Sequence, residues 1–357
     1  MRWPHGRAGP YPLRKFRAFQ SGPLVRPRNC AGNRLSRPPP DFAPGNLPHP
    51  PHVTVLDSLA PLPSGTSVRH LALGFFDGLH LGHRRVILGG EKPHAPALTA
   101  VLTFRDHPLS VLHPEKHPAL ITGLPHKLRV LERWQIGMTV ALPFDANRSR
   151  QEPADFLKEL ASAFPSLQTV SVGPNWRFGK DRSGDVDLLG RWCAERKIHL
   201  DNPDPVVFAG GRISSSRIRA AIAAGQLTDT AEMLGRPFTL FGTVGTGAGR
   251  GAGLGFATAN LQTEDECLPP DGVYAGRAFL DDGKTFPAAI NLGSQPTFGG
   301  QERHPEAHLI GFAGELSGQK LDLEFSKFLR PIQKFESAKA LAAQIQKDVA
   351  VVVKSSP

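Results

Sequence analysis

The chain of 357 residues has few cysteines and no long hydrophobic run. Cys30, Cys193 and Cys267 are far apart and odd in number, which indicates a reducing compartment and argues against a disulfide framework. No apolar segment reaches the roughly 18 residues that a membrane span needs, and no secretory hydrophobic region is present. We therefore expect a cytoplasmic protein that does not bind membranes.

Acidic residues are almost absent from residues 1–50. This segment has nine Lys or Arg residues and one acid, Asp41, so it carries +8 of the formal net charge of +10. The basic character is therefore a property of this tail, and it gives no reason to expect nucleic-acid binding by the rest of the chain. Frequent proline and the lack of an apolar period predict a disordered tail. A transit peptide would be amphipathic and Ser-rich, so we favour a misplaced start codon or a species-specific extension.

The remaining residues are enough for two domains, and their pattern changes part-way along. From His52 to about Gly225, apolar segments alternate with helical patterns, which predicts a parallel sheet covered by helices. After Pro237 the segments are short, β-type and punctuated by Gly, Pro and Asp, which is typical of an antiparallel barrel or sandwich. We therefore expect an α/β domain over residues 51–234 and a β domain over residues 235–357.

The same pattern places individual elements. Strands of the α/β domain are predicted at 98–104, 138–142 and 169–173, and its helices at 125–134 and 154–164. Strands of the β domain are predicted at 238–244, 272–279, 286–291, 306–312 and 320–325. An amphipathic closing helix is predicted over residues 337–353, with Leu341, Ile345 and Val349 facing the core.

One turn of the α/β half combines glycine with histidine. Residues 68–73 predict a buried strand and the residues after His83 predict a helix, so His80 and His83 lie at a strand-to-helix turn. The free N–H groups and partial positive charge of a helix start favour a bound anion, and glycine permits close approach of the backbone. We therefore expect nucleotide phosphates here. The other candidate phosphate-binding residues of this turn are Gly74, Phe75, Asp77 and Gly78.

Two other kinds of site fit the sequence poorly. An isolated pair of histidines is more often structural than functional, and a zinc site is disfavoured because no Cys lies nearby and no Glu lies between the two residues. A P-loop is excluded, because Gly173 and Gly179 enclose five residues rather than four and Asp181 stands where Ser or Thr is required.

Two further segments favour phosphate binding. Ser214, Ser215 and Ser216 lie at a predicted helix start, where their hydroxyls and the guanidinium of Arg219 can bind phosphate oxygens. Such a serine cap is usually only structural, but its combination with the histidine turn is more specific. The stretch 245–255 fits no dinucleotide fingerprint and predicts a flexible loop that folds over phosphates. Its candidate phosphate-binding residues are Gly247, Gly249 and Gly251.

Together these segments resemble the bifunctional bacterial riboflavin kinase/FMN adenylyltransferase family, also called FAD synthetase, over about residues 53–353. Residues 74–83 and 213–219 are similar to the two phosphate motifs of its Rossmann-like nucleotidyltransferase domain, which belongs to the HIGH superfamily. Residues 172–179 resemble its flavin-site motif, and residues 254–261 resemble the Gly-Phe-Pro-Thr-Ala-Asn-Leu motif of its riboflavin kinase barrel. The resemblance assigns flavin binding to Asn175, Arg177 and Phe178, Mg²⁺ binding to Thr258 and Asn260, and the catalytic base to Glu306.

The resemblance implies an enzyme that uses ATP and Mg²⁺ in two reactions. Riboflavin is phosphorylated to FMN in the barrel, where Glu306 accepts the proton of the 5′-hydroxyl. FMN is then adenylylated to FAD in the α/β domain with release of pyrophosphate, and His80 and His83 donate hydrogen bonds to the phosphates in the transition state. The expected partners are riboflavin, FMN and ATP, with no nucleic acid, and the expected state is a monomer or a weak homo-oligomer.

The sequence departs from the family pattern at several positions and leaves alternatives open. Ala257 stands where the family has proline, which loosens the restriction on the neighbouring backbone, so one alternative is an FMN adenylyltransferase with a weakened kinase domain. A non-catalytic flavin sensor is another, although it need not keep His80, Arg219 and Glu306. Nucleotidyltransferases for pantetheine or nicotinamide precursors share the phosphate motifs but not the second half. An aminoacyl-tRNA synthetase should have a Lys-Met-Ser-Lys-Ser type loop, which this chain lacks.

Overall fold

The computed structural model describes residues 54–62, 66–89, 93–245, 258–297 and 300–355. The tail over residues 1–50 and the candidate phosphate-binding residues Gly247, Gly249 and Gly251 lie outside these ranges. Their predicted disorder and phosphate binding therefore stay predictions.

The first half of the described chain contains a parallel sheet of six strands in the order β1-β4-β3-β2-β5-β6. The strands are β1 (Thr54–Leu56), β2 (His70–Leu73), β3 (Thr99–Phe104), β4 (Met138–Leu142), β5 (Thr169–Val172) and β6 (His199–Asp201). The inner strands are almost wholly buried, as continuous apolar runs predict for a parallel sheet covered on both faces. The predicted parallel sheet is confirmed. The edge strands β1 and β6 have three residues each, too few for a sequence pattern to show.

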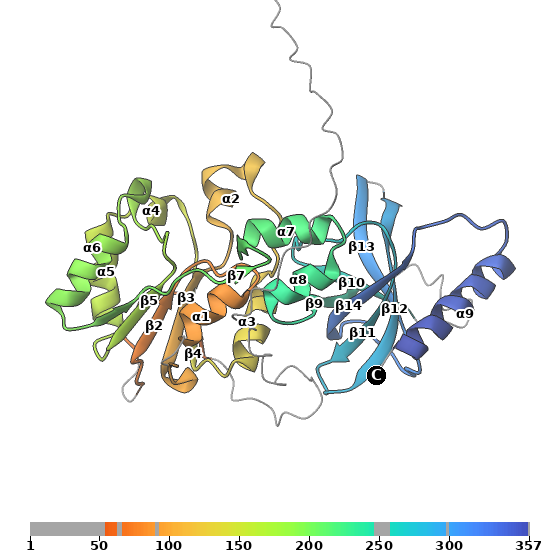
Figure 1. Ribbon diagram of the computed structural model, residues 1–357, viewed down its shortest axis with the longest axis horizontal. Helices are drawn as coiled ribbons and strands as arrows, with labels where there is room; N and C mark the ends of the chain where they lie inside the picture. The colour runs from red at the N-terminus through yellow and green to blue at the C-terminus, as the bar shows by residue number, and fades with distance from the viewer. Residues whose placement is uncertain (1–53, 63–65, 90–92, 246–257, 298–299, 356–357) are drawn as a thin grey trace, which may run out of the picture. The chain divides into compact units, whose positions relative to one another are not determined.

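Helices cover both faces of this sheet (Figure 1). Leu71 of β2 shares one core with Leu160 of α5, whereas its neighbour Ala72 shares another core with Val86 of α1 and Leu131 of α3. Adjacent residues of a strand point to opposite faces, so the two cores lie on opposite sides of the sheet. The long covering helices are α1 (Leu81–Leu88), α3 (Leu124–Arg133), α5 (Pro153–Ala163) and α6 (Val186–Glu195).

Short elements connect the main ones. They are η1 (Pro96–Leu98), α2 (Pro108–Leu112), η2 (Pro114–Lys116), α4 (Ala146–Ser149), η3 (Lys180–Arg182) and the hairpin of β7 (Val207–Phe208) and β8 (Gly211–Arg212). Two helices follow, α7 (Ser215–Ala223) and α8 (Leu227–Leu234). Ile218 of α7 and Leu234 of α8 share a hydrophobic core with Leu240 of the second half, so these helices pack toward the β domain.

The second half is a closed antiparallel barrel in the order β10-β13-β12-β11-β14-β9. Its strands are β9 (Phe238–Gly245), β10 (Thr258–Thr263), β11 (Gly272–Leu280), β12 (Thr285–Thr297), β13 (Gly300–Leu309) and β14 (Lys320–Arg330). Strand β10 was not predicted, and β12 and β13 run further toward their shared turn than the predicted segments do. The polar residues at that end, such as Gln301 and Glu302, give no β pattern, but they pair across the hairpin through their backbone.

The closing helix α9 (Ala338–Ser355) is present, and its predicted core stripe is only partly buried. Leu341, Ile345 and Val349 are only half-buried, whereas Asp348 and Val352 are buried. Val352 packs on the outer side of the barrel, and Asp348 forms an ion pair of 2.7 Å with Arg330. The charged residue is buried because an arginine from the barrel satisfies it, which a count of apolar residues does not reveal.

Candidate active sites

The turn between β2 and α1 places both histidines at the carboxyl end of β2. His80 is the N-cap of α1, and its Nδ1 accepts a hydrogen bond of 3.2 Å from the backbone N–H of His83. The two rings stack with their centroids 3.6 Å apart. Because Nδ1 is the acceptor, a neutral His80 ring carries its proton on Nε2, which is then the donor toward a ligand.

Both rings are neutral at physiological pH. Burial, followed by the positive charges of Arg236 and Arg212, lowers the pKa of His80 to about 3. Burial is also the main cause that holds the pKa of His83 well below its usual value. The histidines of the turn therefore offer N–H donors rather than full positive charges, and a bound phosphate would raise both pKa values by favouring the protonated rings.

The glycines of this turn make room for the protein's own side chains. Gly78 has φ of +85°, and a Cβ there would lie 3.0 Å from the side chain of Ile121. A Cβ on Gly74 would lie 2.9 Å from the ring of Phe76, and one on Gly82 would lie 3.1 Å from the ring of His80. The predicted close approach of a ligand to Gly74 and Gly78 stays a prediction, because packing alone already requires glycine there.

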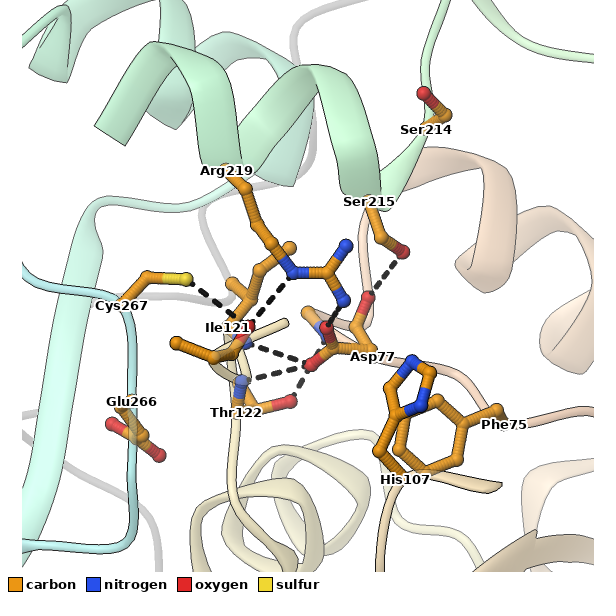
Figure 2. A network of polar contacts seen from close by, with 12 residues as sticks. Phe75, Asp77, His107, Ile121, Thr122, Ser214, Ser215, Arg219, Glu266 and Cys267 are labelled. Carbon is orange, nitrogen blue, oxygen red and sulfur yellow. Dashed lines mark hydrogen bonds and ion pairs between the residues drawn. The ribbon is translucent and has the colours of Figure 1, made fainter. Parts of the chain in front are cut away.

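Asp77 is the centre of a buried hydrogen-bond network (Figure 2). Its side chain is 2% exposed, and Oδ1 accepts from the backbone N–H groups of Ile121 and Thr122 at 2.9 and 3.1 Å. Oδ2 pairs with Nη2 of Arg219 at 2.6 Å. The histidine turn and the helix that carries Arg219 are thus joined by one carboxylate, and the two predicted phosphate motifs lie together.

The serine cluster begins α7, as predicted. Ser214 is its N-cap and accepts from the N–H of Arg217, while the hydroxyl of Ser215 donates to the backbone oxygen of Asp77 at 2.9 Å (Figure 2). Arg219 also donates from Nε to the backbone oxygen of Ala119 at 2.8 Å. Ser215 and Arg219 therefore hold the turn, and their contact with phosphate stays a prediction.

A pocket of about 340 Å³ lies between the histidine turn and the start of α7. The predicted site residues that line it are Gly74, Phe75, Asp77, His80, His83, Asn175, Ser214, Ser215 and Ser216. Gly78, Arg177, Phe178 and Arg219 do not line it. The pocket is lined by both phosphate motifs and by one residue of the flavin motif. Transfer between two phosphates requires such an arrangement, because both reactants must be held side by side.

The residues of the predicted flavin motif differ in exposure: Arg177 is at the surface, whereas Phe178 is buried. Asn175 lines both the main pocket and a neighbouring one of about 390 Å³, which Arg177 also lines. Arg177 is exposed and pairs with Asp185 at 3.2 Å. Phe178 is 8% exposed and stacks on Trp176 with ring centroids 4.5 Å apart, so it supports Trp176 and lines neither of these pockets.

The predicted kinase residues lie side by side on the barrel. Asn260 of β10 is directly opposite Glu306 of β13, which is opposite Asn291 of β12. Their neighbours Ala259 and Ala307 are buried in the barrel interior, so the polar row lies on the outer face. Thr258 precedes Asn260 by two residues and lies on the same face.

This set of side chains suits a magnesium ion that a nucleotide brings with it. A hydroxyl, an amide oxygen and a carboxylate are hard oxygen donors, and Mg²⁺ is usually held by few protein ligands together with substrate phosphates. Within the described part of the chain, no group of three or more His, Cys, Asp or Glu residues could hold a metal by itself. The donors Thr258 and Asn260 therefore fit an ion that phosphates also coordinate.

Comparison with known proteins gives a matching family for each half of the chain. The FAD synthetase family model matches residues 63–217, and the riboflavin kinase family model matches residues 234–356. The bifunctional riboflavin kinase/FMN adenylyltransferase of Escherichia coli strain K12 is 32% identical over 282 residues, which span 78% of this chain and 90% of that protein. The chain belongs to the bifunctional riboflavin kinase/FMN adenylyltransferase family.

Other relatives extend the likeness. The bifunctional riboflavin kinase/FMN adenylyltransferase of Listeria monocytogenes is 33% identical over 286 residues, covering 78% of this chain and 89% of that protein. A crystal structure described as a macrolide-efflux protein from Streptococcus pneumoniae superposes with a TM-score of 0.72 at 26% identity, covering 85% of this chain and all of that one. Among the residues that the structure describes, no helix is long and apolar enough to cross a membrane.

Three basic residues of this family member were missed by the sequence analysis. Arg212 lines the main pocket, and Arg236 is one of the positive charges that lower the pKa of His80. Lys127 is buried in α3, where its Nζ donates to the backbone oxygen of Phe75 at 2.7 Å and to Thr103 at 3.1 Å. Burial lowers the pKa of Lys127 to about 8. Only Arg212, two residues before the serine cluster, had a neighbouring motif that could have drawn attention to it.

Proposed function

We propose that the chain catalyses both steps from riboflavin to FAD, in two separate sites. The outer face of the barrel phosphorylates riboflavin with ATP, and the pocket of the α/β half adenylylates FMN with a second ATP. The observation that carries the adenylyltransferase proposal is the Asp77–Arg219 ion pair of 2.6 Å, because it brings both phosphate motifs to one pocket. The proposal for the kinase rests on the row formed by Asn260 and Glu306.

In the kinase site, we propose that Glu306 accepts the proton of the ribityl 5′-hydroxyl while that oxygen attacks the γ-phosphorus of ATP. The bond to the β,γ-bridging oxygen breaks and ADP leaves. Thr258 and Asn260 would hold Mg²⁺, which when bound offsets the negative charge of the phosphates. Phosphoryl transfer depends mainly on in-line positioning and electrostatic stabilisation. One carboxylate and these oxygen donors are therefore enough for the proposed reaction.

In the adenylyltransferase pocket, a phosphate oxygen of FMN would attack the α-phosphorus of ATP and pyrophosphate would leave. His80 donates from Nε2, His83 from its own ring, and the start of α7 adds hydroxyls and free N–H groups. No general base is needed, because a phosphate monoester is already an anion near neutral pH. Arg219 would add positive charge beside the pocket, and Asn175 and Arg177 would contact the flavin.

We further propose the finer features that accompany this function. The divalent metal is Mg²⁺, the substrates are riboflavin, FMN and ATP, and the two functional domains cover residues 51–234 and 235–357. The protein acts as a monomer or weak homo-oligomer in the cytoplasm and binds no nucleic acid. The concentration of basic residues in positions 1–50 supports the last point, because the remainder carries a net charge of only +2.

Chromatography of the reaction products tests the proposal. The purified chain is incubated with riboflavin, ATP and MgCl₂, and separately with FMN, ATP and MgCl₂. We expect FMN and then FAD in the first reaction, FAD and pyrophosphate in the second, and neither product when EDTA is present. FAD from FMN without FMN from riboflavin would contradict the kinase half of the proposal, and the opposite result would contradict the adenylyltransferase half.

A further inference from the structure

Arg236 lies between α8 and β9, in the segment that the riboflavin kinase family model matches, yet its guanidinium contacts the histidine turn. Nη2 donates to the backbone oxygen of Gly78 at 2.9 Å, and Nη1 donates to that of Leu79 at 3.1 Å. The residue is 6% exposed. A buried arginine thus binds the two consecutive carbonyls that come directly before His80.

This contact fixes the orientation of two peptide planes. A guanidinium is planar and rigid, so two of its N–H groups can hold two neighbouring oxygens in a defined geometry, which a flexible ammonium cannot do. The ring of His80 follows this backbone directly, and its Nδ1 is already engaged by the N–H of His83. With the preceding peptides and Nδ1 both held, the direction of Nε2 is set.

The residue before Arg236 supports the other side of the same turn. Gly235 ends α8 with φ of +72°, and a Cβ on it would overlap Cδ2 of Leu81. Leu81 is the first residue of α1 and follows His80. The dipeptide Gly235-Arg236 therefore contacts the chain on both sides of His80, through a side-chain packing contact and through hydrogen bonds.

The charge of Arg236 acts on the same rings. Arg236 and Arg212 are the positive groups that lower the pKa of His80, and the stacked ring of His83 is affected by these two arginines, by Lys127 and by His80. Burial remains the largest cause for both histidines. Removing the guanidinium would therefore loosen the turn and also make the rings easier to protonate.

We propose that Arg236 is a positioning residue of the adenylyl-transfer site, which orients His80 by holding the backbone oxygens of Gly78 and Leu79. The inference rests on the proposed adenylyltransferase function. It means that the pocket of the α/β half is completed by a residue from the kinase-matched half. Arg236 does not line the pocket, so we expect its effect in the rate of the chemical step more than in substrate binding.

A second arginine supplies the matched control. Arg129 of α3 also joins the two halves, because it donates from Nε and Nη2 to buried Asp322 of β14 at 3.0 and 2.8 Å. It has no hydrogen bond to the histidine turn among the contacts of the described residues. A general weakening of the contact between the halves would affect Arg129→Lys and Arg236→Lys alike, whereas the proposed positioning role affects only the second.

The experiment compares Arg236→Lys and Arg129→Lys with the unmodified full chain in both reactions. For Arg236→Lys we expect kcat of FMN adenylylation to fall about 10- to 100-fold, since a displacement of about 1 Å costs up to about 100-fold. The KM values for ATP and FMN should change by less than about threefold, and kcat of riboflavin phosphorylation by less than about twofold, because the barrel site keeps its residues. Arg129→Lys should leave both reactions within about twofold, because lysine keeps the positive charge and Arg133 still pairs with buried Asp322 at 2.6 Å.

A spectroscopic measurement separates positioning from partial unfolding. Histidine ring signals are followed by NMR from pH 7.5 to 3.5, a range in which the unmodified His80 ring, with its pKa lowered to about 3, stays largely neutral. The His80 signal is assigned with His80→Gln. We expect the titration of His80 to move to higher pH in Arg236→Gln, where the charge is lost, and to change little in Arg236→Lys, where it is kept. An unchanged titration in Arg236→Gln would overturn the electrostatic part of the role.

The remaining outcomes are distinguishable. Adenylylation in Arg236→Lys within about twofold of the unmodified chain, or an equal loss of both reactions in that variant, would overturn the positioning role. If the unmodified chain forms no FAD from FMN and ATP, the proposed function itself fails. If it forms FAD and Arg236→Lys also does at the same rate, only the inference about Arg236 fails.

Discussion

At the scale of single residues, His83 is the predicted donor to the phosphates of the adenylyl-transfer reaction. Its ring lines the pocket and stacks on His80, and its Nδ1 is buried with no hydrogen-bond partner among the described residues. A donor aimed at developing phosphate charge contributes about 100- to 1000-fold to the rate. We expect His83→Ala to lower FAD formation by this factor and to leave FMN formation from riboflavin unchanged. Equal loss of both products in a folded variant, measured by chromatography, would argue against separate sites.

Glu306 provides the reciprocal test at the same scale. Glutamine keeps the size of the side chain but cannot accept the proton of the riboflavin hydroxyl, and general-base catalysis is worth about 100- to 10,000-fold. We expect Glu306→Gln to lower riboflavin phosphorylation by this factor while FMN is still converted to FAD. Initial rates with riboflavin and with FMN as separate substrates check both statements. Normal phosphorylation by this variant would exclude Glu306 as the base.

At the scale of elements, the strand-to-helix turn depends on glycine conformation as well as on histidine. Gly78 and Gly283 have φ of +85° and +84°, but a Cβ meets Ile121 at 3.0 Å in the first case and nothing within 4 Å in the second. An L side chain in this region costs about 1–2 kcal/mol. We expect Gly283→Ala to lower the free energy of unfolding by about this amount and Gly78→Ala to lower it by more, because its Cβ also presses on Ile121. Both are measured in urea, and only Gly78→Ala should reduce adenylylation. Equal adenylylation by the two variants would contradict this.

Elements also differ in how far the sequence could predict them. Strand β4 has the predicted bounds, because a buried central strand is a continuous apolar run between polar turns. Strand β10 was overlooked, because its residues 259–262 are neither β-branched nor aromatic, and because the sequence before it is glycine-rich. The buried position of Asp348 in α9 was missed, because this carboxylate is buried through its pairing with Arg330 on the barrel.

At the scale of the whole molecule, buried neutral histidines make stability depend on pH. His70 is 4% exposed, lies 3.1 and 2.7 Å from the hydroxyls of Thr99 and Ser171, and stacks on His94. Burial, then the charge of His94, lowers the pKa of His70 to about 3. In the unfolded chain histidine binds a proton near pH 6.5, so below that pH the unfolded state binds more protons and stability falls.

The expected loss is about 1.4 kcal/mol per pH unit for each such histidine between pH 6.5 and pH 3, with no contribution above that window. Urea unfolding at pH 8, 7, 6 and 5 measures this slope. In His70→Gln, where an amide replaces the ring between the two hydroxyls, we expect a shallower slope over the same range. The same slope in the variant and the unmodified chain would show that His70 does not contribute.

The sequence by itself predicted the two-part architecture and the helix starts at the serine cluster and the histidine turn, and its short motifs carried the resemblance to the family. These depend on short-range rules, because strand and helix periods and N-caps are set by residues close in sequence. The tertiary structure decided which distant groups meet: Asp77 with Arg219, Asn260 with Glu306, and Arg236 with the carbonyls before His80. Those contacts arise from chain topology and packing, and no local pattern marks an arginine as the partner of a turn more than 150 residues away.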